Sequence, residues 1–200
     1  PFANYWIHNG MLMIRGEEMH KSLGNFVTLE QAFTRWDPMV IRFFVLLSHY
    51  RGPINYSLAQ IEQADAALGR LYTALRELPV PPVNQPSIAP ESNSASEDAS
   101  KAWQQFHAAM DDDFNTPEAL AVLQGLAGEI NRARDAHDQA SAIKAAEEMR
   151  VIGAVLGILL LPADAWFKAS KSVFFNILCS CLHSLFRHVW PELGRWEAAL

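Results

Sequence analysis

The sequence has 200 residues, half of them hydrophobic, and a formal net charge of −6 at pH 7. This length and composition suit a globular protein with a buried core, in one large domain or two small ones. The only two cysteines, Cys179 and Cys181, lie too close together to join distant parts of a fold, so no disulfide framework is implied and a reducing cytoplasm is the expected setting. The acidic charge neither supports nor excludes RNA binding, because a few placed Lys and Arg residues make phosphate contacts.

The first part of the chain predicts a short β-hairpin followed by helices. Apolar residues at 11–14 favour a strand that turns at Arg15-Gly16. Residues 28–31 form a capping-box pattern, in which a Thr hydroxyl and a Gln side chain satisfy free backbone N–H groups, so a helix should begin there. Asp37-Pro38 supplies an N-cap and a favourable first residue for a mostly apolar, buried helix over 39–49.

The next segment predicts an amphipathic helix and then a linker. Ser57 is a suitable N-cap for a helix that continues to about Leu78. Residues 79–98 are rich in Pro and polar side chains and poor in large apolar ones, which is typical of an exposed linker. Helices should resume at about Ala99. The apolar residues of the first helix recur at near-helical spacing: Ile61, Leu68, Leu71, Tyr72 and Leu75.

Two further helices complete a predicted bundle. Residues 115–118 read Asn-Thr-Pro-Glu, which is a helix start signal, and a further helix is expected over about 139–160. We therefore expect the middle and later chain to form an α-helical bundle. One face of the first of these two helices carries Leu120, Leu123, Leu126 and Ile130.

Several polar groups downstream have both a structural and a functional interpretation. Three aspartates at 111–113 could hold a hard cation, but consecutive side chains diverge, so we expect them instead to cap the N-terminus of the following helix, where negative charge is favourable. Arg132 and Arg134 suit either an RNA backbone or the end of their own helix. Residues 179–183 lack the usual two-residue gap between zinc-binding cysteines, so we expect no zinc site there. The apolar stretch 173–186 is too short and too often interrupted for a bilayer span, so it favours a buried helix.

The segment most informative about chemistry is 17–26. It places Lys21 on a short polar loop, with Gly24 two residues beyond Ser22, between a predicted strand and a capped helix. An ammonium group on such a loop can reach a triphosphate and stabilise charge that develops on a departing pyrophosphate. The structural alternative, an ordinary surface lysine in a turn, remains open on spacing alone.

These residues resemble the K-M-S-K-S signature of class I aminoacyl-tRNA synthetases. The continuation over 22–26 and the preceding segment 5–11 are close to the cysteinyl-tRNA synthetase family in particular. Residues 110–120 resemble the opening of that family's helical domain. The resemblance extends from residue 1 to about 168, and it includes three runs similar to the family's stem-contact region: 42–44, 48–51 and 55–57.

The resemblance assigns roles to loop residues. Lys21 matches the signature's second lysine, which the family uses on the ATP phosphates, and is the expected catalytic residue for pyrophosphate stabilisation. Met19 and Ser22 also match, and Gly24 and Asn25 are expected to shape the loop, so these five residues form the expected ATP-binding set.

Two positions depart from the signature. Glu18 stands where the family has its first lysine, and His20 stands where it has its first serine. An anion beside a triphosphate site repels nucleotide phosphate. His20 could donate a hydrogen bond to phosphate when protonated, although an exposed loop histidine without a role is the favoured interpretation.

The resemblance implies a mainly α fold. Residues 1–56 should form the end of a class I synthetase catalytic domain, with a short β-hairpin, the signature loop and stem-contact helices. Residues 57–168 should form the α-helical tRNA-side domain, with its linker at 79–98. Residues 169–200 form a divergent apolar tail of unassigned function. The first residues show no targeting signal, and the start of the chain looks cut from a longer protein.

The implied activity is the ATP-dependent joining of cysteine to its tRNA through a cysteinyl-adenylate, and the 200-residue chain alone should be inactive. ATP with Mg²⁺, cysteine and the tRNA for cysteine are the expected ligands of a cytoplasmic enzyme, more plausibly a monomer than an oligomer and without a membrane. A zinc ion is expected in the complete enzyme through ligands that this chain lacks, so no metal ligand is assigned here. Two alternatives stay open: a cysteine ligase acting on an aminocyclitol sugar, and a non-catalytic helical module that binds RNA or protein.

Overall fold

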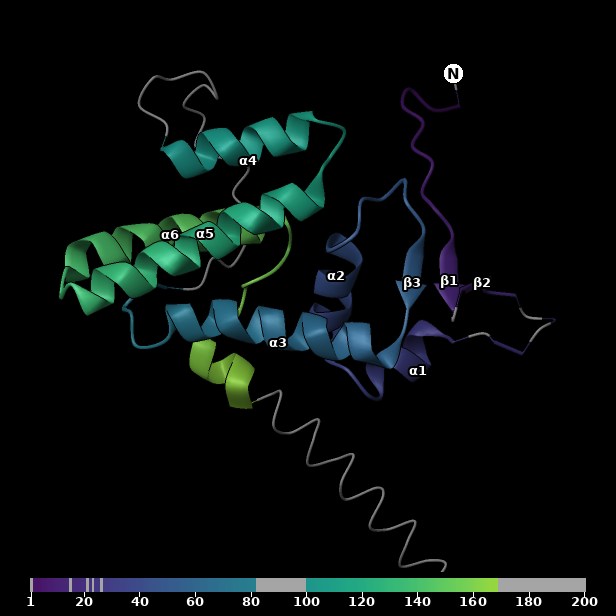
Figure 1. The fold of residues 1–200 in the computed structure, drawn as a ribbon, viewed down its shortest axis with the longest axis horizontal. Coiled ribbons are helices and arrows are strands. Elements are labelled where there is room, and N and C mark those ends of the chain that lie inside the picture. The colour runs from purple at the N-terminus through teal and green to yellow at the C-terminus, as the bar shows by residue number, and fades with distance from the viewer. Residues whose placement is uncertain are drawn as a thin grey trace, which may run out of the picture.

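A computed structural model describes residues 2–14, 16–20, 22, 24–25, 27–81 and 100–168 of the chain. Its first element is a small mixed sheet at one end of the molecule (Figure 1). β1 (Leu12–Ile14) pairs antiparallel with β2 (Glu17–Glu18), which confirms the predicted hairpin, and Gly16 in the turn has a φ of 84°. On its other side β1 pairs in parallel with β3 (Ile54–Tyr56), a strand that the sequence did not predict.

Two short helices connect β2 to β3. α1 (Leu29–Phe33) begins with the predicted capping box at Thr28, and the predicted N-cap Asp37 accepts a hydrogen bond from the Met39 backbone at the start of α2 (Pro38–Leu46). The α2 helix ends before the expected His49. The residues after it form turns that lead into β3, and these turns carry side chains of the candidate site.

Four longer helices form the rest of the described fold. In Figure 1, α4 lies across α5 and α6 on one side of the molecule, and α3 runs along the other side toward the sheet. A further helical stretch at 163–168 lies against α3. The bounds are α3 (Leu58–Leu75), α4 (Lys101–Asp111), α5 (Thr116–Asp135) and α6 (Gln139–Val155).

Two further helices, α3 and α6, also end earlier than the sequence predicted, for identifiable reasons. After α3, Arg76 adopts an extended conformation and Glu77 a left-handed one, with a φ of 65°. After α6, Gly157 has a φ of 69°, its N–H bonds the Ala154 carbonyl, and the Ile158 N–H bonds the Gly153 carbonyl. This pattern is a Schellman motif, which ends a helix at a left-handed glycine.

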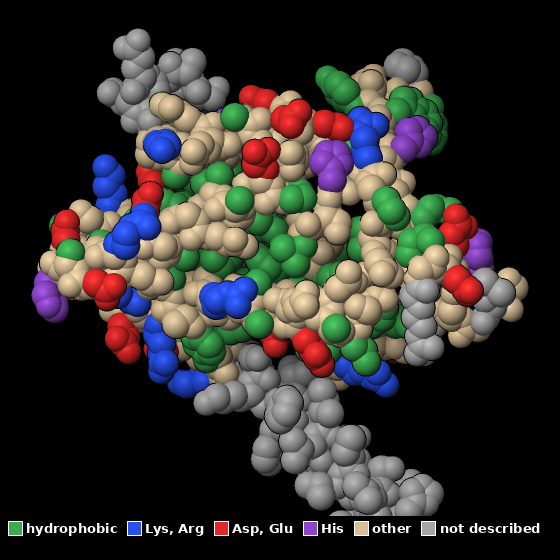
Figure 2. Space-filling model, in the orientation of Figure 1, with side chains coloured by type: hydrophobic (Ala, Val, Ile, Leu, Met, Phe, Trp, Pro, Cys, Tyr) green, Lys and Arg blue, Asp and Glu red, His purple; other side chains and the backbone are tan. Residues whose placement is uncertain are grey.

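The core joins the sheet end to the helical end. Phe43 of α2, Leu68 of α3 and the predicted apolar face of α5 are almost completely buried in one cluster. On the face drawn in Figure 2, hydrophobic side chains gather between α4 and α3, and charged ones lie around them. The predicted mainly helical fold is therefore confirmed. The buried residues of the α5 face are Leu120, Leu123, Leu126 and Ile130.

Several expectations fall outside the described residues. These are the apolar tail from 169 onward, with its expected buried helix at 173–186 and the cysteine segment 179–183, and most of the expected linker, from 82 to 98. Within the described part of the chain, no helix is both long and apolar enough to cross a membrane.

Candidate functional site

The signature loop is closed by the side chain of Asn25. Its amide oxygen accepts a hydrogen bond from the His20 backbone N–H at 2.9 Å, and its amide nitrogen donates to the Glu18 carbonyl at 3.0 Å. Between these two residues, the Met19 N–H donates to the Leu12 carbonyl of β1 at 3.1 Å. Asn25 therefore fixes the backbone of both neighbours of Met19, and the loop begins directly after β2 of the hairpin.

A glycine, Gly24, provides the backbone conformation with which the loop turns back toward Glu18. Gly24 has a φ of 66°, a conformation that other residues adopt at a cost, and no atom lies within 4 Å of where a Cβ would stand. Ser22 is exposed, and Lys21, the expected catalytic residue, lies outside the described residues.

The two positions that depart from the family signature contact each other. His20 Nε2 lies 3.1 Å from a carboxylate oxygen of Glu18, and both side chains are about half exposed, at 53% and 47%. When His20 is protonated, this ion pair offsets the negative charge of Glu18. His20 is exposed, as expected, and among the described residues its side chain pairs with the carboxylate that replaces the family lysine.

A groove of about 840 Å³ lies beside the loop, at the carboxyl ends of the parallel strands β1 and β3. The last residue of each strand lines it, Ile14 and Tyr56, and so do Gly24 and Asn25 of the loop. Ligands of open α/β sheets bind outside the carboxyl ends of parallel strands. Arg35, after α1, also lines this groove, and no described residue pairs with its side chain.

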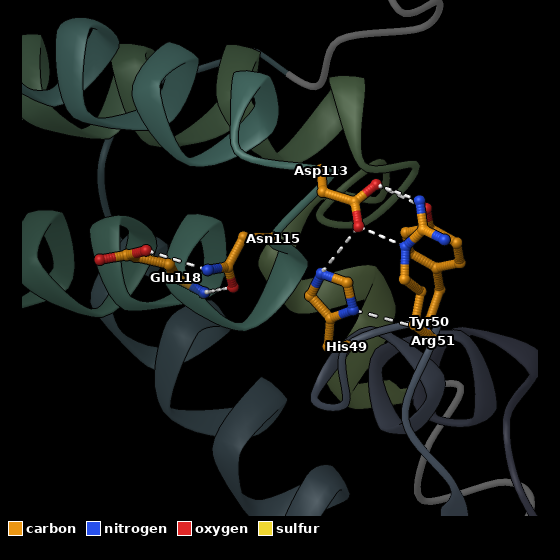
Figure 3. A network of polar contacts seen from close by, with 6 residues as sticks. All are labelled: His49, Tyr50, Arg51, Asp113, Asn115 and Glu118. Atoms are coloured by element: carbon orange, nitrogen blue, oxygen red, sulfur yellow. Dashed lines mark hydrogen bonds and ion pairs between the residues drawn. The ribbon is translucent and has the colours of Figure 1, made fainter. Parts of the chain in front are cut away.

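A second cluster joins the turn after α2 to the turn between α4 and α5 (Figure 3). The Tyr50 hydroxyl donates to Asp113 Oδ1 at 2.6 Å. Arg51 donates to both carboxylate oxygens, through Nη2 to Oδ1 at 2.9 Å and through Nε to Oδ2. His49 Nε2 lies 4.0 Å from Oδ2. Hydrogen bonds from Arg51 and Tyr50 lower the pKa of the Asp113 carboxyl to about 2.

Aromatic contacts surround this polar cluster. The Tyr50 ring stacks on His49 with centroids 5.0 Å apart, and it meets the edge of Phe114 at 6.5 Å. The Arg51 guanidinium carbon lies 5.2 Å from the centre of the Tyr50 ring. The cluster of His49, Tyr50, Arg51, Asp113 and Phe114 is called the clasp below.

The predicted role of the aspartates at 111–113 is wrong. The side chain that caps α5 belongs to Asn115, whose Oδ1 accepts from the Glu118 N–H at 3.4 Å. Asp111 ends α4, Asp112 is its C-cap, and Asp113 turns away from α5 toward Arg51, as Figure 3 shows. The start signal at 115–118 is confirmed.

Arg134 makes a structural contact. Its guanidinium donates to the carbonyl of Arg76, the C-cap of α3, so it ties the end of α5 to the end of α3. Across the described residues, no group of three or more His, Cys, Asp or Glu side chains is arranged to hold a metal ion.

Two protein-family models match this chain, one over its sheet end and one over its helical end. Residues 1–66 match the family model described as the tRNA synthetases class I (C) catalytic domain, and residues 105–160 match the model described as the DALR domain. The signature loop and its groove fall within the first match, and α5 and α6 fall within the second. The chain thus has the parts of a class I aminoacyl-tRNA synthetase, in the order catalytic end and then helical domain.

Curated relatives narrow this class. The chain is 51% identical to a cysteine-tRNA ligase of Alkalilimnicola ehrlichii over 159 residues, which cover 80% of the chain and 32% of the relative. It is 46% identical to one of Methylococcus capsulatus over 173 residues, covering 84% of the chain and 34% of the relative. The chain belongs to the cysteine-tRNA ligase family and spans about a third of the length of these relatives.

Proposed function

We propose that the chain supplies the ATP loop and the tRNA-side helices of an enzyme that joins cysteine to its tRNA through a cysteinyl-adenylate. Lys21 is the proposed catalytic residue, and Met19, Ser22, Gly24 and Asn25 complete the ATP-binding loop. The observation that carries this proposal is the groove at the carboxyl ends of β1 and β3, which Gly24 and Asn25 line.

Adenylate formation explains what such a loop does. A cysteine carboxylate oxygen attacks the α-phosphorus of ATP, a new P–O bond forms, and the bond to the bridging oxygen of pyrophosphate breaks. Negative charge then gathers on the departing pyrophosphate. A lysine ammonium at Lys21 stabilises this charge more in the transition state than in the ground state, which raises the rate.

Other residues of the groove support or oppose nucleotide binding. Arg35 offers a guanidinium with no described partner, and guanidinium groups bind phosphate oxygens well. Glu17 also lines the groove and places a carboxylate near the proposed phosphates, and Glu18 follows it in β2. The contact of His20 with Glu18 reduces this repulsion when the imidazole is protonated.

Membership of the family supports ATP, cysteine and the tRNA for cysteine as the substrates of the complete enzyme. The proposal adds that ATP enters as its Mg²⁺ complex and that the enzyme is cytoplasmic and monomeric. Zinc in the complete enzyme would need ligands from elsewhere, since the described residues contain no suitable group, and no step is assigned to it here.

A chimeric ligase tests the proposal. The matched stretch of the Alkalilimnicola ehrlichii relative is replaced by the corresponding residues of this chain, and cysteine-dependent exchange of pyrophosphate into ATP is measured. We expect exchange in the chimera, a loss of about a hundredfold in Lys21→Ala, and none from the 200-residue chain alone. Unchanged exchange in Lys21→Ala would remove that residue from the mechanism.

A second candidate, a helical binding module without catalysis, is favoured by one observation. Glu18 stands at the position in the signature loop where the family carries its first lysine. Calorimetric titration of the chimera with ATP distinguishes the two functions. Binding that Lys21→Ala weakens supports the ligase, and the absence of any ATP binding supports the module.

A further inference from the structure

We propose that Asp113 is a positioning residue: through the clasp it fixes the helical region, α4 to α6, against the strands that carry the ATP loop. The proposal rests on the proposed function, because it assigns tRNA to the helices and ATP to the loop. Asp113 would contact neither substrate, but it would set how the ATP loop and the tRNA-side helices lie relative to each other.

The first support is the geometry of the Asp113 carboxylate. Isolated surface ion pairs contribute little, but networks with two-point arginine contacts contribute more. Here one carboxylate receives two hydrogen bonds from Arg51 and one from Tyr50, with His49 within ion-pair distance. The backbone N–H of Arg51 donates to His49 Nδ1 at 3.3 Å. A neutral His49 therefore carries its proton on Nε2, the nitrogen that faces Asp113.

The second support is the backbone that presents this carboxylate. Asp113 and Phe114 have φ values of 52° and 54°, so two consecutive non-glycine residues adopt the left-handed conformation. Such residues persist only where surrounding contacts hold them, at a cost of about 1 kcal/mol or more each. Backbone hydrogen bonds from the Phe114 N–H to the Met110 carbonyl and from the Asn115 N–H to the Ala109 carbonyl close this turn, and the clasp adds side-chain contacts, with Asp113 on Arg51 and Phe114 on Tyr50.

The third support is the connection from the clasp to the loop. The Tyr50 carbonyl accepts a hydrogen bond from the Gly10 N–H at 2.6 Å, and the Ile54 N–H donates to the Met11 carbonyl at 2.9 Å. These bonds lie at the start of the parallel β1–β3 pair. One strand further, β2 leads into the loop that Asn25 closes. The turn that binds Asp113 is thus bonded directly to the sheet beneath the ATP groove.

A hydrogen-exchange experiment on the 200-residue chain tests the link. Asp113→Asn removes the carboxylate charge but suits the left-handed backbone, because asparagine adopts it readily. We expect the Gly10 and Ile54 amides to exchange about tenfold faster, while the amides of Leu123 and Ile130 in the α5 core keep their rates. Unchanged exchange at Gly10, or equal acceleration in α5, would overturn the proposal.

Two comparisons make the result specific. Asp111→Asn removes the same charge two residues away, at an exposed position outside the clasp, and should leave the Gly10 amide unchanged. Arg51→Lys keeps a positive charge but loses the two-point contact, so it should accelerate exchange at Gly10. Added to Asp113→Asn, Arg51→Lys should have almost no further effect, since the two changes remove one interaction. Additive effects would contradict the proposed pairing.

Catalysis by the chimeric ligase separates this proposal from the proposed function. In Asp113→Asn, we expect pyrophosphate exchange to stay within about twofold of the unsubstituted chimera and kcat/KM for tRNA to fall about tenfold, because only the second reaction needs both regions aligned. Exchange lost in the unsubstituted chimera contradicts the ATP assignment. Normal exchange with unchanged tRNA charging in Asp113→Asn contradicts the role of Asp113.

Discussion

The ring of Trp166 lies flat on the ring of Tyr72, with centroids 4.5 Å apart and 9° between the two planes. Both side chains are buried, with exposed fractions of 3% for Trp166 and 0% for Tyr72. Stacked aromatic pairs contribute about 1 kcal/mol beyond the burial of their area. This pair packs the helical stretch 163–168, which follows α6, against α3.

Burial of Tyr72 should make stability depend on alkaline pH. Loss of hydration raises the pKa of Tyr72 from 10.0 to about 12. A raised pKa means that the folded state keeps its proton longer than the unfolded state, so this contribution is complete below pH 10 and is lost as pH rises toward 12. Urea unfolding across this range should show a steeper loss of stability in the unsubstituted chain than in Tyr72→Phe. Equal losses would contradict the assignment.

The Asp113 contacts should fail only in strong acid. Hydrogen bonds from Arg51 and Tyr50 lower the pKa of this carboxyl from 3.8 to about 2, so the folded state holds the ionised form more firmly than the unfolded state. The contribution is present above about pH 4 and disappears as pH falls toward 2. The difference in Tm between the unsubstituted chain and Asp113→Asn should narrow across this window. A constant difference would show that the two proteins differ for another reason.

The glycine that ends α6 should not tolerate a side chain. Gly157 has a φ of 69°, and a Cβ there would meet the Arg42 guanidinium of α2. We expect Gly157→Ala to lower the free energy of unfolding by about 2 kcal/mol. Gly125 within α5 has open space where a Cβ would stand, with no atom within 4 Å, so Gly125→Ala should raise it by about 0.5–1 kcal/mol. Denaturant unfolding measures both, and equal effects would contradict this difference.

The amide of Asn25 should matter for ATP. Asn25→Asp retains an acceptor for the His20 N–H but loses the donor to the Glu18 carbonyl and adds a negative charge beside the groove. In the chimeric ligase we expect the KM for ATP to rise about tenfold. Asn9→Asp makes the same change at an exposed residue whose amide, among the described residues, donates to the Gly10 carbonyl, and it should leave this KM unchanged. Similar effects of both substitutions would point to general repulsion of ATP instead.

Local signals in the sequence predicted much of the fold. The capping box at Thr28 and the N-caps Asp37, Ser57 and Asn115 begin helices in the structure as expected. These signals act over three or four residues, so they can be recognised without knowing the fold. The stop at Gly157 was also local, but the apolar residues beyond it concealed the helix end.

The remaining features depend on contacts between distant residues. Asp113 lies in a run of aspartates before a helix, where capping was the reasonable expectation, and its partner Arg51 is far away in the sequence. Likewise, the Ile54–Tyr56 strand is too short to reveal its pairing with β1, and the groove exists only because of that pairing. The loop residues were recognised through family resemblance, and their roles stay predictions.

The parallel pairing of β1 with β3 also bears on the order in which the chain folds. Leu12 lies opposite Ile54, and the whole of α1 and α2 separates them in the sequence. Such a pair forms only after a long segment has closed, which is slow, whereas α5 and α6 are joined by a short turn and can associate early. We therefore expect the helical hairpin to form first and the groove beside the signature loop to be among the last parts of the molecule to assemble.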